Sequence, residues 1–335
     1  MVFARACFTT GTGRPGRECH PGTLLAAWLL ALAMVLGAGQ ARAADRGAAH
    51  YTIAMVTHAQ PGDAFWDQVR KGGAASARAH HVDFIYLHGK TPRKQAAELR
   101  NVITQHVDGI ALTLAFPNAL RPLIEEARAA GIPVVAFNSG FTTWKSMGIA
   151  MYVGQDERLA GNQVGERLNR AGVRKVLCVN QQQGAVQLAA RCQGIAETFD
   201  GEAQTLFLKR YDMSVARTRI IAKLIQDPDI DAVVTLGSPF APVAVRAVRM
   251  ANSDARVVTF DLGSMRIAKL IKAGEIEWAV DQQPYLQGYE SVDLLWLDIT
   301  NGNVLGGGEP VLTGPTFITR DNIDRIIPFI ERGTR

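Results

Sequence analysis

The chain has 335 residues, of which 47% are hydrophobic and 20% are charged, and its formal net charge is +5. This composition excludes a predominantly disordered chain, and the length suffices for one large domain or two medium ones, each with its own core. Residues 1–43 alone carry a net charge of +3, so only +2 remains for the rest of the chain. We therefore expect no nucleic-acid partner.

An apolar run stands near the start of the chain, where residues 24–36 read LLAAWLLALAMVL. Arginines precede it, and Ala41-Arg42-Ala43 follows it. At 1.5 Å per residue the run is too short for a bilayer core of about 30 Å, and its small-residue ending is typical of a signal peptidase site. We predict that residues 1–43 are a cleavable signal peptide and that the mature protein is periplasmic. An N-terminal membrane anchor is the alternative.

Two cysteines, Cys178 and Cys192, lie beyond this segment. In an oxidising compartment they can form a disulfide, and the alternative is a pair of buried thiols that behave as small apolar side chains. Both interpretations stay open. All seven histidines lie at or before His106, so no metal-ligand spacing includes the two cysteines, and we predict neither a metal nor a cofactor.

The rest of the chain alternates β-branched runs with helical patterns. The runs at 51–57, 82–87, 109–114 and 133–138 predict buried parallel strands, and the same alternation returns at 175–179, 205–208, 232–236, 257–260 and 278–280. Between the strands lie helices such as the one that Thr91 would cap and Pro92 would begin. Repeated strand–helix–strand units predict an α/β fold with two doubly wound parallel-sheet lobes.

No Gly/Ser-rich linker separates these halves, so we expect the chain to pass between them along strands. Three stretches fit such crossings: residues 152–156, 282–284 and 314–315. The predicted N-terminal lobe then comprises residues 44–154 and 283–313, and the C-terminal lobe comprises residues 155–282 and 314–335. A three-strand hinge would join the two lobes, and a ligand would lie between them.

Polar side chains follow most of the predicted strands. They occur at His58 to Trp66, Asn138 to Gly140, Asn180 to Gln183, Gly237-Ser238, Asp261 and Asp281 to Gln283. In open α/β sheets the ligand crevice lies beyond the carboxyl ends of the strands. Amide groups both donate and accept hydrogen bonds, which suits ligand hydroxyl groups, and the neighbouring aromatic rings offer flat apolar faces. The pattern predicts binding of a small sugar or polyol.

Enzymatic and regulatory functions find no support in the motifs. The first strand is followed by HAQPGDAF and not by a glycine-rich dinucleotide loop, and neither a Walker A loop nor a Gly-x-Ser-x-Gly elbow occurs. A sugar-responsive repressor of the same lobed architecture would need a helix-turn-helix where the apolar run stands. We therefore predict a binding protein and not an enzyme.

Several stretches, in this order and spacing, also carry a resemblance to a known family: DAFW, VDGIALTL with GIPVVAFNS, YVGQDERLAG, AARCQG, VVTFD and DQQPYLQGY. Over essentially the whole mature length the chain resembles the ribose-binding-protein-like group of type I periplasmic solute-binding proteins. The resemblance implies a monomer that closes around a sugar and presents it to an ABC transporter permease. Presentation to a membrane sensor is the alternative.

The resemblance also implies roles for single residues. Phe65 and Trp66 resemble stacking aromatics, Arg191 an arginine that bridges vicinal hydroxyls, Asp261 a hydroxyl acceptor and Gln282 a hinge glutamine. The predicted ligand-binding residues are Asp63, Phe65, Trp66, Asn138, Arg191, Ser238, Asp261 and Gln282.

Two departures from the ribose-type pattern concern the ligand. Asn138 stands where an aspartate is usual, and Gly237-Ser238 stands where Asn-Asp is usual. A charge-assisted hydrogen bond is roughly twice as strong as a neutral one. The ligand is therefore not expected to be ribose by default.

Overall fold

The computed structural model describes residues 50–60, 62–208 and 212–335. The predicted signal peptide at residues 1–43 lies outside the described residues. Contacts unite residues 50–335 in one unit, which contains two six-stranded sheets. Among the helices of the described ranges, none combines the length and the apolar character that a membrane span requires.

The two sheets share one strand order. The first runs β11-β5-β4-β3-β1-β2 and the second runs β12-β10-β9-β8-β6-β7. The strands of the first sheet are β1 Thr52–Thr57, β2 Asp83–His88, β3 Gly109–Thr113, β4 Val134–Phe137, β5 Met151–Gln155 and β11 Val311–Gly314. Those of the second are β6 Lys175–Asn180, β7 Glu202–Phe207, β8 Ala232–Thr235, β9 Arg256–Phe260, β10 Trp278–Asp281 and β12 Thr316–Thr319.

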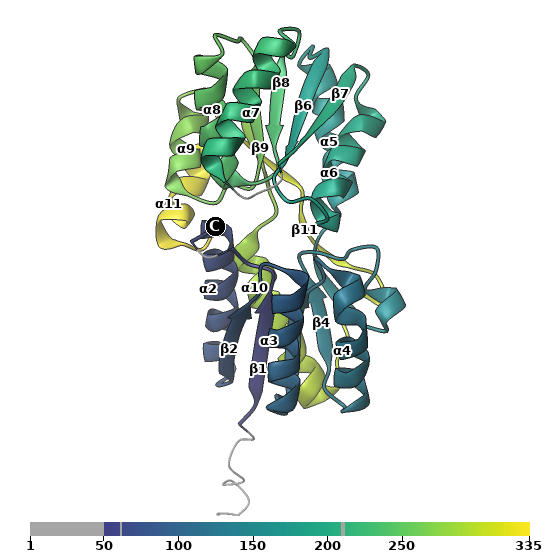
Figure 1. Ribbon diagram of the computed structural model, residues 1–335. Helices are drawn as coiled ribbons and strands as arrows, with labels where there is room; N and C mark the ends of the chain where they lie inside the picture. Colours follow the sequence, from purple (N-terminus) through teal and green to yellow (C-terminus); the bar gives the residue numbers. More distant parts are fainter. Residues whose placement is uncertain (1–49, 61, 209–211) are drawn as a thin grey trace, which may run out of the picture. The chain divides into compact units, whose positions relative to one another are not determined.

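Helices cover both faces of each sheet, as Figure 1 shows. In the first lobe, α2 and α10 cover one face, and α3 and α4 cover the other. In the second lobe, α5 and α6 lie on one face, and α7, α8, α9 and α11 lie on the other. Their bounds are α2 Ala64–Ala79, α3 Pro92–Thr104, α4 Pro117–Ala129, α5 Glu157–Arg170, α6 Val186–Thr198, α7 Met213–Gln226, α8 Ala241–Met250, α9 Met265–Lys272, α10 Pro284–Asn301 and α11 Ile323–Arg332. Two short 3₁₀ turns span Lys145–Met147 and Ser238–Phe240.

The chain passes between the sheets in three places. It crosses from β5 to α5, from β10 to α10, and from β11 to β12, where the Gly314–Pro315 peptide is cis. The prediction of two parallel-sheet lobes joined by three crossings is confirmed. The residue numbers at which one lobe ends and the other begins stay a prediction.

Two strands differ from the expectations. The strand expected at residues 205–208 is β7, which begins at Glu202, because an edge strand with alternating exposure has no continuous apolar run to mark its start. In addition, β12 pairs with β10 in antiparallel orientation, so the second sheet is not wholly parallel.

Local sequence signals explain several helix ends. The Thr91 hydroxyl accepts a hydrogen bond from the Lys94 N–H at the start of α3. Asp156 does the same for the first turn of α5, where its carboxylate accepts from Arg158 N–H and Leu159 N–H. Thr91 therefore acts as the helix cap that the sequence predicts, and Asp156 is a residue type that commonly caps helices.

A close contact between α5 and α6 depends on glycine. A Cβ at Gly161 would lie 2.3 Å from the Arg191 carbonyl oxygen, and one at Gly194 would lie 2.2 Å from the Arg158 carbonyl oxygen. Such distances leave no room for a side chain, so the two backbones meet directly. This contact fixes the part of α6 from which Arg191 projects.

A disulfide joins Cys178 on β6 to Cys192 on α6, with 5.9 Å between their Cα atoms. Of the two interpretations left open by the sequence, the structure has the disulfide. The bridge attaches α6 to β6, the neighbour of the edge strand β7 in the second sheet, one residue away from Arg191.

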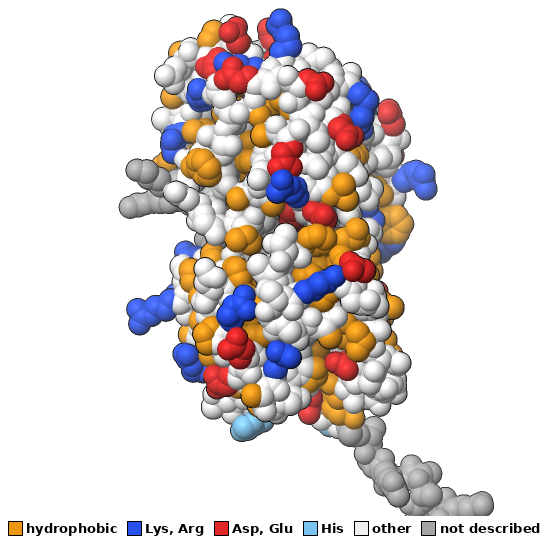
Figure 2. All heavy atoms as spheres, turned by 90° about the vertical axis from the view of Figure 1, so that its right-hand side faces the viewer, with side chains coloured by type: hydrophobic (Ala, Val, Ile, Leu, Met, Phe, Trp, Pro, Cys, Tyr) orange, Lys and Arg blue, Asp and Glu red, His pale blue; other side chains and the backbone are white. Residues whose placement is uncertain are grey.

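Charged side chains of both signs are interspersed on the face shown in Figure 2. Neither lysine and arginine nor aspartate and glutamate gather there in an extended field of one sign.

Candidate functional site: the cleft between the two sheets

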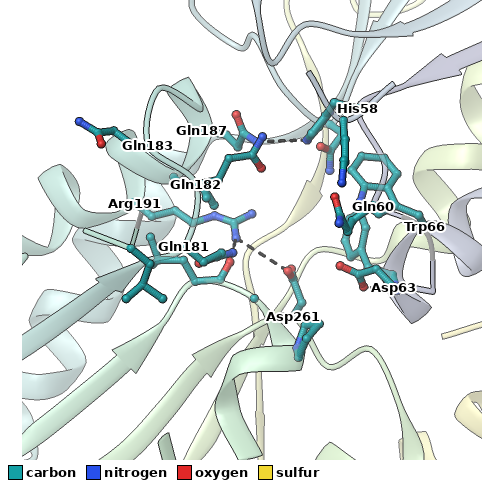
Figure 3. A pocket seen from close by; sticks show the side chains of 18 of the residues that line it. His58, Gln60, Asp63, Trp66, Gln181, Gln182, Gln183, Gln187, Arg191 and Asp261 are labelled. Atoms are coloured by element: carbon teal, nitrogen blue, oxygen red, sulfur yellow. Dashed lines mark hydrogen bonds and ion pairs between the residues drawn. The ribbon is translucent and has the colours of Figure 1, made fainter. Parts of the chain in front are cut away.

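A cavity of about 580 Å³ lies between the lobes, where strands of both sheets end. Figure 3 shows Arg191 and Gln187 on one side of it and His58, Gln60, Trp66 and Asp63 on the other. The lining residues are His58, Gln60, Asp63, Phe65, Trp66, Lys90, Thr91, Asn138, Gln181, Gln182, Gln183, Gln187, Leu188, Arg191, Leu208, Leu236, Gly237, Pro239, Asp261 and Gln282. Seven of these twenty residues are asparagine or glutamine, whose side-chain amides both donate and accept hydrogen bonds.

Arg191 is the central cation of the cleft. Its side chain is only 3% exposed, and its Nε and Nη2 atoms donate to the two carboxylate oxygens of Glu157 at 2.7 and 2.9 Å. Nη1 donates to the Leu236 carbonyl at 2.8 Å and lies 3.8 Å from the Asp261 carboxylate. Burial opposes the charge of Arg191, but the Glu157 and Asp261 carboxylates more than offset it, so the pKa of Arg191 lies above its ordinary value.

Asp261 supplies the opposing carboxylate. It follows β9, and its Oδ1 atom accepts a hydrogen bond from Gln282 Nε2 at 2.7 Å. Burial raises the pKa of Asp261 to about 7, although Arg191 and the Gln282 hydrogen bond act in the opposite direction. Near neutral pH this carboxyl is therefore poised between its protonated and ionised forms.

An amide network connects the cleft to the crossings between the lobes. Asn138 Nδ2 donates to Gln282 Oε1 at 3.3 Å and to Gln287 Oε1 at 3.0 Å. Gln287 Nε2 donates in turn to the Gln282 side chain at 2.9 Å and to the Thr313 hydroxyl at 3.0 Å. Because Asn138, Gln282 and Thr313 lie at the ends of β4, β10 and β11, the network joins residues next to two of the three crossings.

Three aromatic rings from the first lobe form the other side of the cleft. Trp66 lies edge-on to both Phe65 and His58, with ring centroids 5.0 and 4.6 Å apart. Asp63 begins the helix that carries Phe65 and Trp66, and its carboxylate accepts the Phe65 N–H at 3.1 Å. The rings of Phe65 and Trp66 therefore lie in the first turn of α2, directly at the cavity.

His58 is neutral and bridges the two lobes. Burial, together with the positive charge of Arg191, lowers the pKa of His58 to about 3. The Thr113 hydroxyl oxygen already accepts from the backbone N–H of His58 at 3.1 Å and from Gln95 Nε2 at 2.9 Å. Since a hydroxyl has two lone pairs, its own proton points to His58 Nδ1, 2.9 Å away, and the ring proton resides on Nε2.

Gln187 of the second lobe faces that ring proton, with 3.2 Å between its amide nitrogen and His58 Nε2. Among the described residues, Gln187 Oε1 has no hydrogen-bond partner. Exchanging the amide oxygen and nitrogen would place an acceptor opposite His58 Nε2. Gln181 Oε1 is also buried and without a partner in the described part of the chain, which leaves it as an acceptor for a ligand hydroxyl group.

Three non-glycine residues at strand ends have left-handed backbone conformations. The φ angles are 62° for Asn138, 67° for Asp261 and 57° for Gln283. Side chains other than asparagine and aspartate seldom adopt this region. The unfavourable backbone turns Asn138 and Asp261 toward the cleft, where both line the cavity.

Seven of the eight predicted ligand residues line the cavity: Asp63, Phe65, Trp66, Asn138, Arg191, Asp261 and Gln282. Ser238 does not, whereas its neighbours Gly237 and Pro239 do. A Cβ added at Gly263 would lie only 2.2 Å from the Ser238 Oγ, so the Ser238 side chain faces the loop after β9. A short 3₁₀ turn begins at Ser238 and reorients it.

Sequence reasoning missed Glu157 and Gln187 and did not assign His58 to the ligand. Glu157 follows the capping residue Asp156 and looks like a favourable charge in the first turn of a helix. Gln187 lies on α6 four residues before Arg191, which places both side chains on one helix face. That spacing was the available signal.

The described residues contain no group of three or more histidine, cysteine, aspartate or glutamate side chains that could hold a metal ion. Two lobes, a polar cleft between them and crossings that carry cleft residues define a class of two-lobed ligand-binding proteins.

Comparison with known proteins places the chain within that class. The family described as "Periplasmic binding protein domain" matches residues 53–303, and the chain belongs to this family. Within it, the chain is of the ribose-binding type. Periplasmic binding proteins act outside the cytoplasm, and their role is binding, not catalysis.

Two curated relatives are similar along most of the described chain. The xylose/arabinose-binding protein XylF of Sulfolobus acidocaldarius is 24% identical over 252 residues, which cover 68% of this chain but only 60% of that protein. The ribose import binding protein RbsB of Bacillus subtilis is 25% identical over 233 residues, which cover 67% of this chain and 74% of that protein.

A solved structure is considerably more similar. It is a carbohydrate transporter from Acidothermus cellulolyticus in complex with myo-inositol, with 49% sequence identity and a TM-score of 0.83. The match covers 85% of this chain and 100% of that one.

Proposed function

We propose that this protein binds an uncharged cyclic polyol or sugar, with myo-inositol as the first candidate, and delivers it to an ABC importer. The observation that carries the proposal is the convergence of amide, carboxyl and guanidinium groups from both lobes on one cavity beside aromatic rings. The 49% identical carbohydrate transporter that contains myo-inositol supports the choice of ligand.

Binding would proceed by hinge closure. Arg191 and Asp261 lie on the second lobe, and Trp66 and Asn138 lie on the first. A polyol that contacts both groups stabilises only the conformation in which they are close together. The class is among the standard examples of hinge closure. A membrane partner would then recognise the closed form.

Ring shape and charge agree with an inositol. A cyclohexane polyol presents a hydroxyl group on every carbon, which suits donors and acceptors on all sides of the cavity. Its C–H face suits Trp66 and Phe65. Arg191, which is already paired with Glu157, acts as a hydrogen-bond donor toward a neutral hydroxyl.

A thermal-shift series tests the ligand. Purified mature protein is melted with myo-inositol, scyllo-inositol, ribose, xylose, arabinose, galactose and, as unrelated controls, leucine and adenosine. A ligand at 100 times its dissociation constant stabilises the protein by about 2.7 kcal/mol. We expect the largest shift with an inositol. If leucine or adenosine shifts the transition and no polyol or sugar does, the proposed function is wrong.

Delivery to an importer has its own test. Cells that lack the protein should lose uptake of the labelled ligand and regain it with the wild-type gene. Sensing is the second candidate, because the same closed form can be recognised by a membrane receptor. Intact uptake together with a lost transcriptional response to the ligand would favour sensing over import.

A further inference from the structure

We propose that Glu157 sets the charge selectivity of the cleft: by holding and neutralising Arg191, it makes the site accept uncharged polyols and reject their phosphate esters and carboxylate forms. The inference rests on the proposed function and deepens it. Glu157 does not line the cavity, so it acts through Arg191 as a positioning residue.

Glu157 and Arg191 form a buried ion pair. Glu157 is the first residue of α5, and its side chain is 4% exposed, against 3% for Arg191. Two parallel hydrogen bonds of 2.7 and 2.9 Å join the carboxylate to the guanidinium, which is a bidentate arrangement. Gln155 Nε2 holds the same carboxylate at 2.7 Å.

Two N–H donors of Arg191 remain available to a ligand. A guanidinium has five N–H groups, and Glu157 and the Leu236 carbonyl occupy three of those of Arg191. One N–H on each terminal nitrogen is left, on the side where Asp261 lies 3.8 Å away and the cavity opens. Two vicinal hydroxyl groups can accept these two hydrogen bonds.

Arg191 is the only buried cation among the residues that line the cavity. The other charged groups that line the cavity are Asp63, Asp261 and the exposed Lys90. Glu157 neutralises Arg191, and a phosphate or carboxylate on the ligand would therefore lie near Asp261 and Asp63 with no unmatched buried cation. Like charges at short range in a buried site oppose binding strongly. Without Glu157, the same arginine would be a free bidentate anion receptor.

The test compares one uncharged ligand with its anionic derivative. Affinities of wild-type protein for myo-inositol and myo-inositol 1-phosphate are measured by titration calorimetry, with glucose and glucose 6-phosphate as a second pair. In Glu157→Gln we expect the preference for the uncharged member to fall at least tenfold. Glu157→Asp, which keeps the charge, should retain the wild-type preference.

The matched control is Glu197→Gln. Glu197 pairs with Arg158 on the neighbouring helix surface, away from the cavity lining. The substitution and the change in total charge are the same as in Glu157→Gln. This variant should keep the wild-type preference. A preference in Glu157→Gln within twofold of wild type overturns the inference.

A second variant protects the test against a folding failure of Glu157→Gln. The double variant Glu157→Gln/Arg191→Gln contains neither charge, so it should keep the wild-type preference while binding more weakly. A double variant that prefers the phosphate overturns the inference. If wild-type protein binds no uncharged polyol or sugar at all, the proposed function fails, and that outcome is distinct from an unchanged preference in the variants.

Discussion

The two sides of the cleft are built from different chemistry. The first lobe contributes all the rings, His58, Phe65 and Trp66, beside the polar Gln60, Asp63 and Asn138. The second contributes the buried ion pair of Arg191, the carboxyl of Asp261 and the loop glutamines. The aromatic side can fit many ring-shaped ligands by contact area. The polar side requires hydroxyl groups at fixed positions. Specificity should therefore depend chiefly on the second lobe.

The second lobe also has a covalent tether beside its ligand residues. A close glycine contact holds a ligand-bearing helix in both lobes, at Gly161 between α5 and α6 and at Gly72 between α2 and α10. The Cys178–Cys192 disulfide acts in addition on the helix that carries Arg191. Within the described residues the first lobe contains no such bridge. The four predictions below challenge this difference, in order of decreasing expected effect.

Arg191→Ala should have the largest effect. It leaves the Glu157 carboxylate buried and unpaired, which costs about 3–5 kcal/mol of unfolding free energy, and it should strongly reduce ligand-induced stabilisation. Urea unfolding with and without ligand measures both effects. The control is Arg158→Ala, whose pair with Glu197 is largely exposed and should contribute less than about 1 kcal/mol. Equal losses in the two variants would contradict the assignment.

Removing the disulfide should come next. For a loop of about 15 residues, a cross-link stabilises the folded state by about 3 kcal/mol. Cys178→Ala/Cys192→Ala should lose an amount of this order in urea unfolding and should also bind ligand more weakly, because Arg191 adjoins the bridge. Wild-type protein treated with a reductant serves as the control and should move the same way. Unchanged affinity would show that the bridge does not position Arg191.

The pH dependence of stability should reveal Asp261. Its native pKa is about 7, whereas an unfolded aspartate has a pKa of about 3.9. The stabilisation by the extra proton is thus fully present below about pH 4 and is lost as the pH rises through 7. From pH 5 to 8, the ligand-free wild type should lose on the order of 2 kcal/mol relative to Asp261→Asn. Parallel pH profiles for the two proteins would refute this.

The aromatic side should give the smallest effect. Trp66→Phe keeps a ring at the cleft, whereas Trp66→Leu removes it, so ligand affinity should differ between these two variants by about 1 kcal/mol. Titration calorimetry measures the difference, and both variants should unfold with similar midpoints. If Trp66→Leu weakens binding as much as Arg191→Ala, the contrast between the two sides of the cleft is wrong.

Much of this architecture was predictable because periodic patterns report burial. Apolar runs predict the central strands, and capping residues such as Thr91 and Asp156 predict helix starts. The edge strand β7 has alternating exposure, so its start was misplaced. Strand ends predict which residues meet, since parallel strands bring their carboxyl ends to one edge.

The partners of those residues were not predictable in the same way. Arg191 could be assigned to the cleft, but its pairing with Glu157 depends on how closely α5 packs against α6, the next helix along the chain. Ser238 lies outside the cavity lining because a single 3₁₀ turn decides where its side chain points. Contacts of that kind depend on tertiary geometry, which no local pattern encodes.

The left-handed backbone at Asn138 and Asp261 limits how this cleft can change over evolutionary time. At both positions, β-branched or bulky residues would strain the chain, so the tolerated alternatives are essentially asparagine, aspartate and glycine. New ligand preferences at these two positions must then arise by exchanging a neutral acceptor for an anionic one, or by deleting the side chain. Exchanges between asparagine and aspartate alter which hydroxyl groups are recognised and leave the size of the cavity nearly unchanged, whereas glycine at either position would enlarge it.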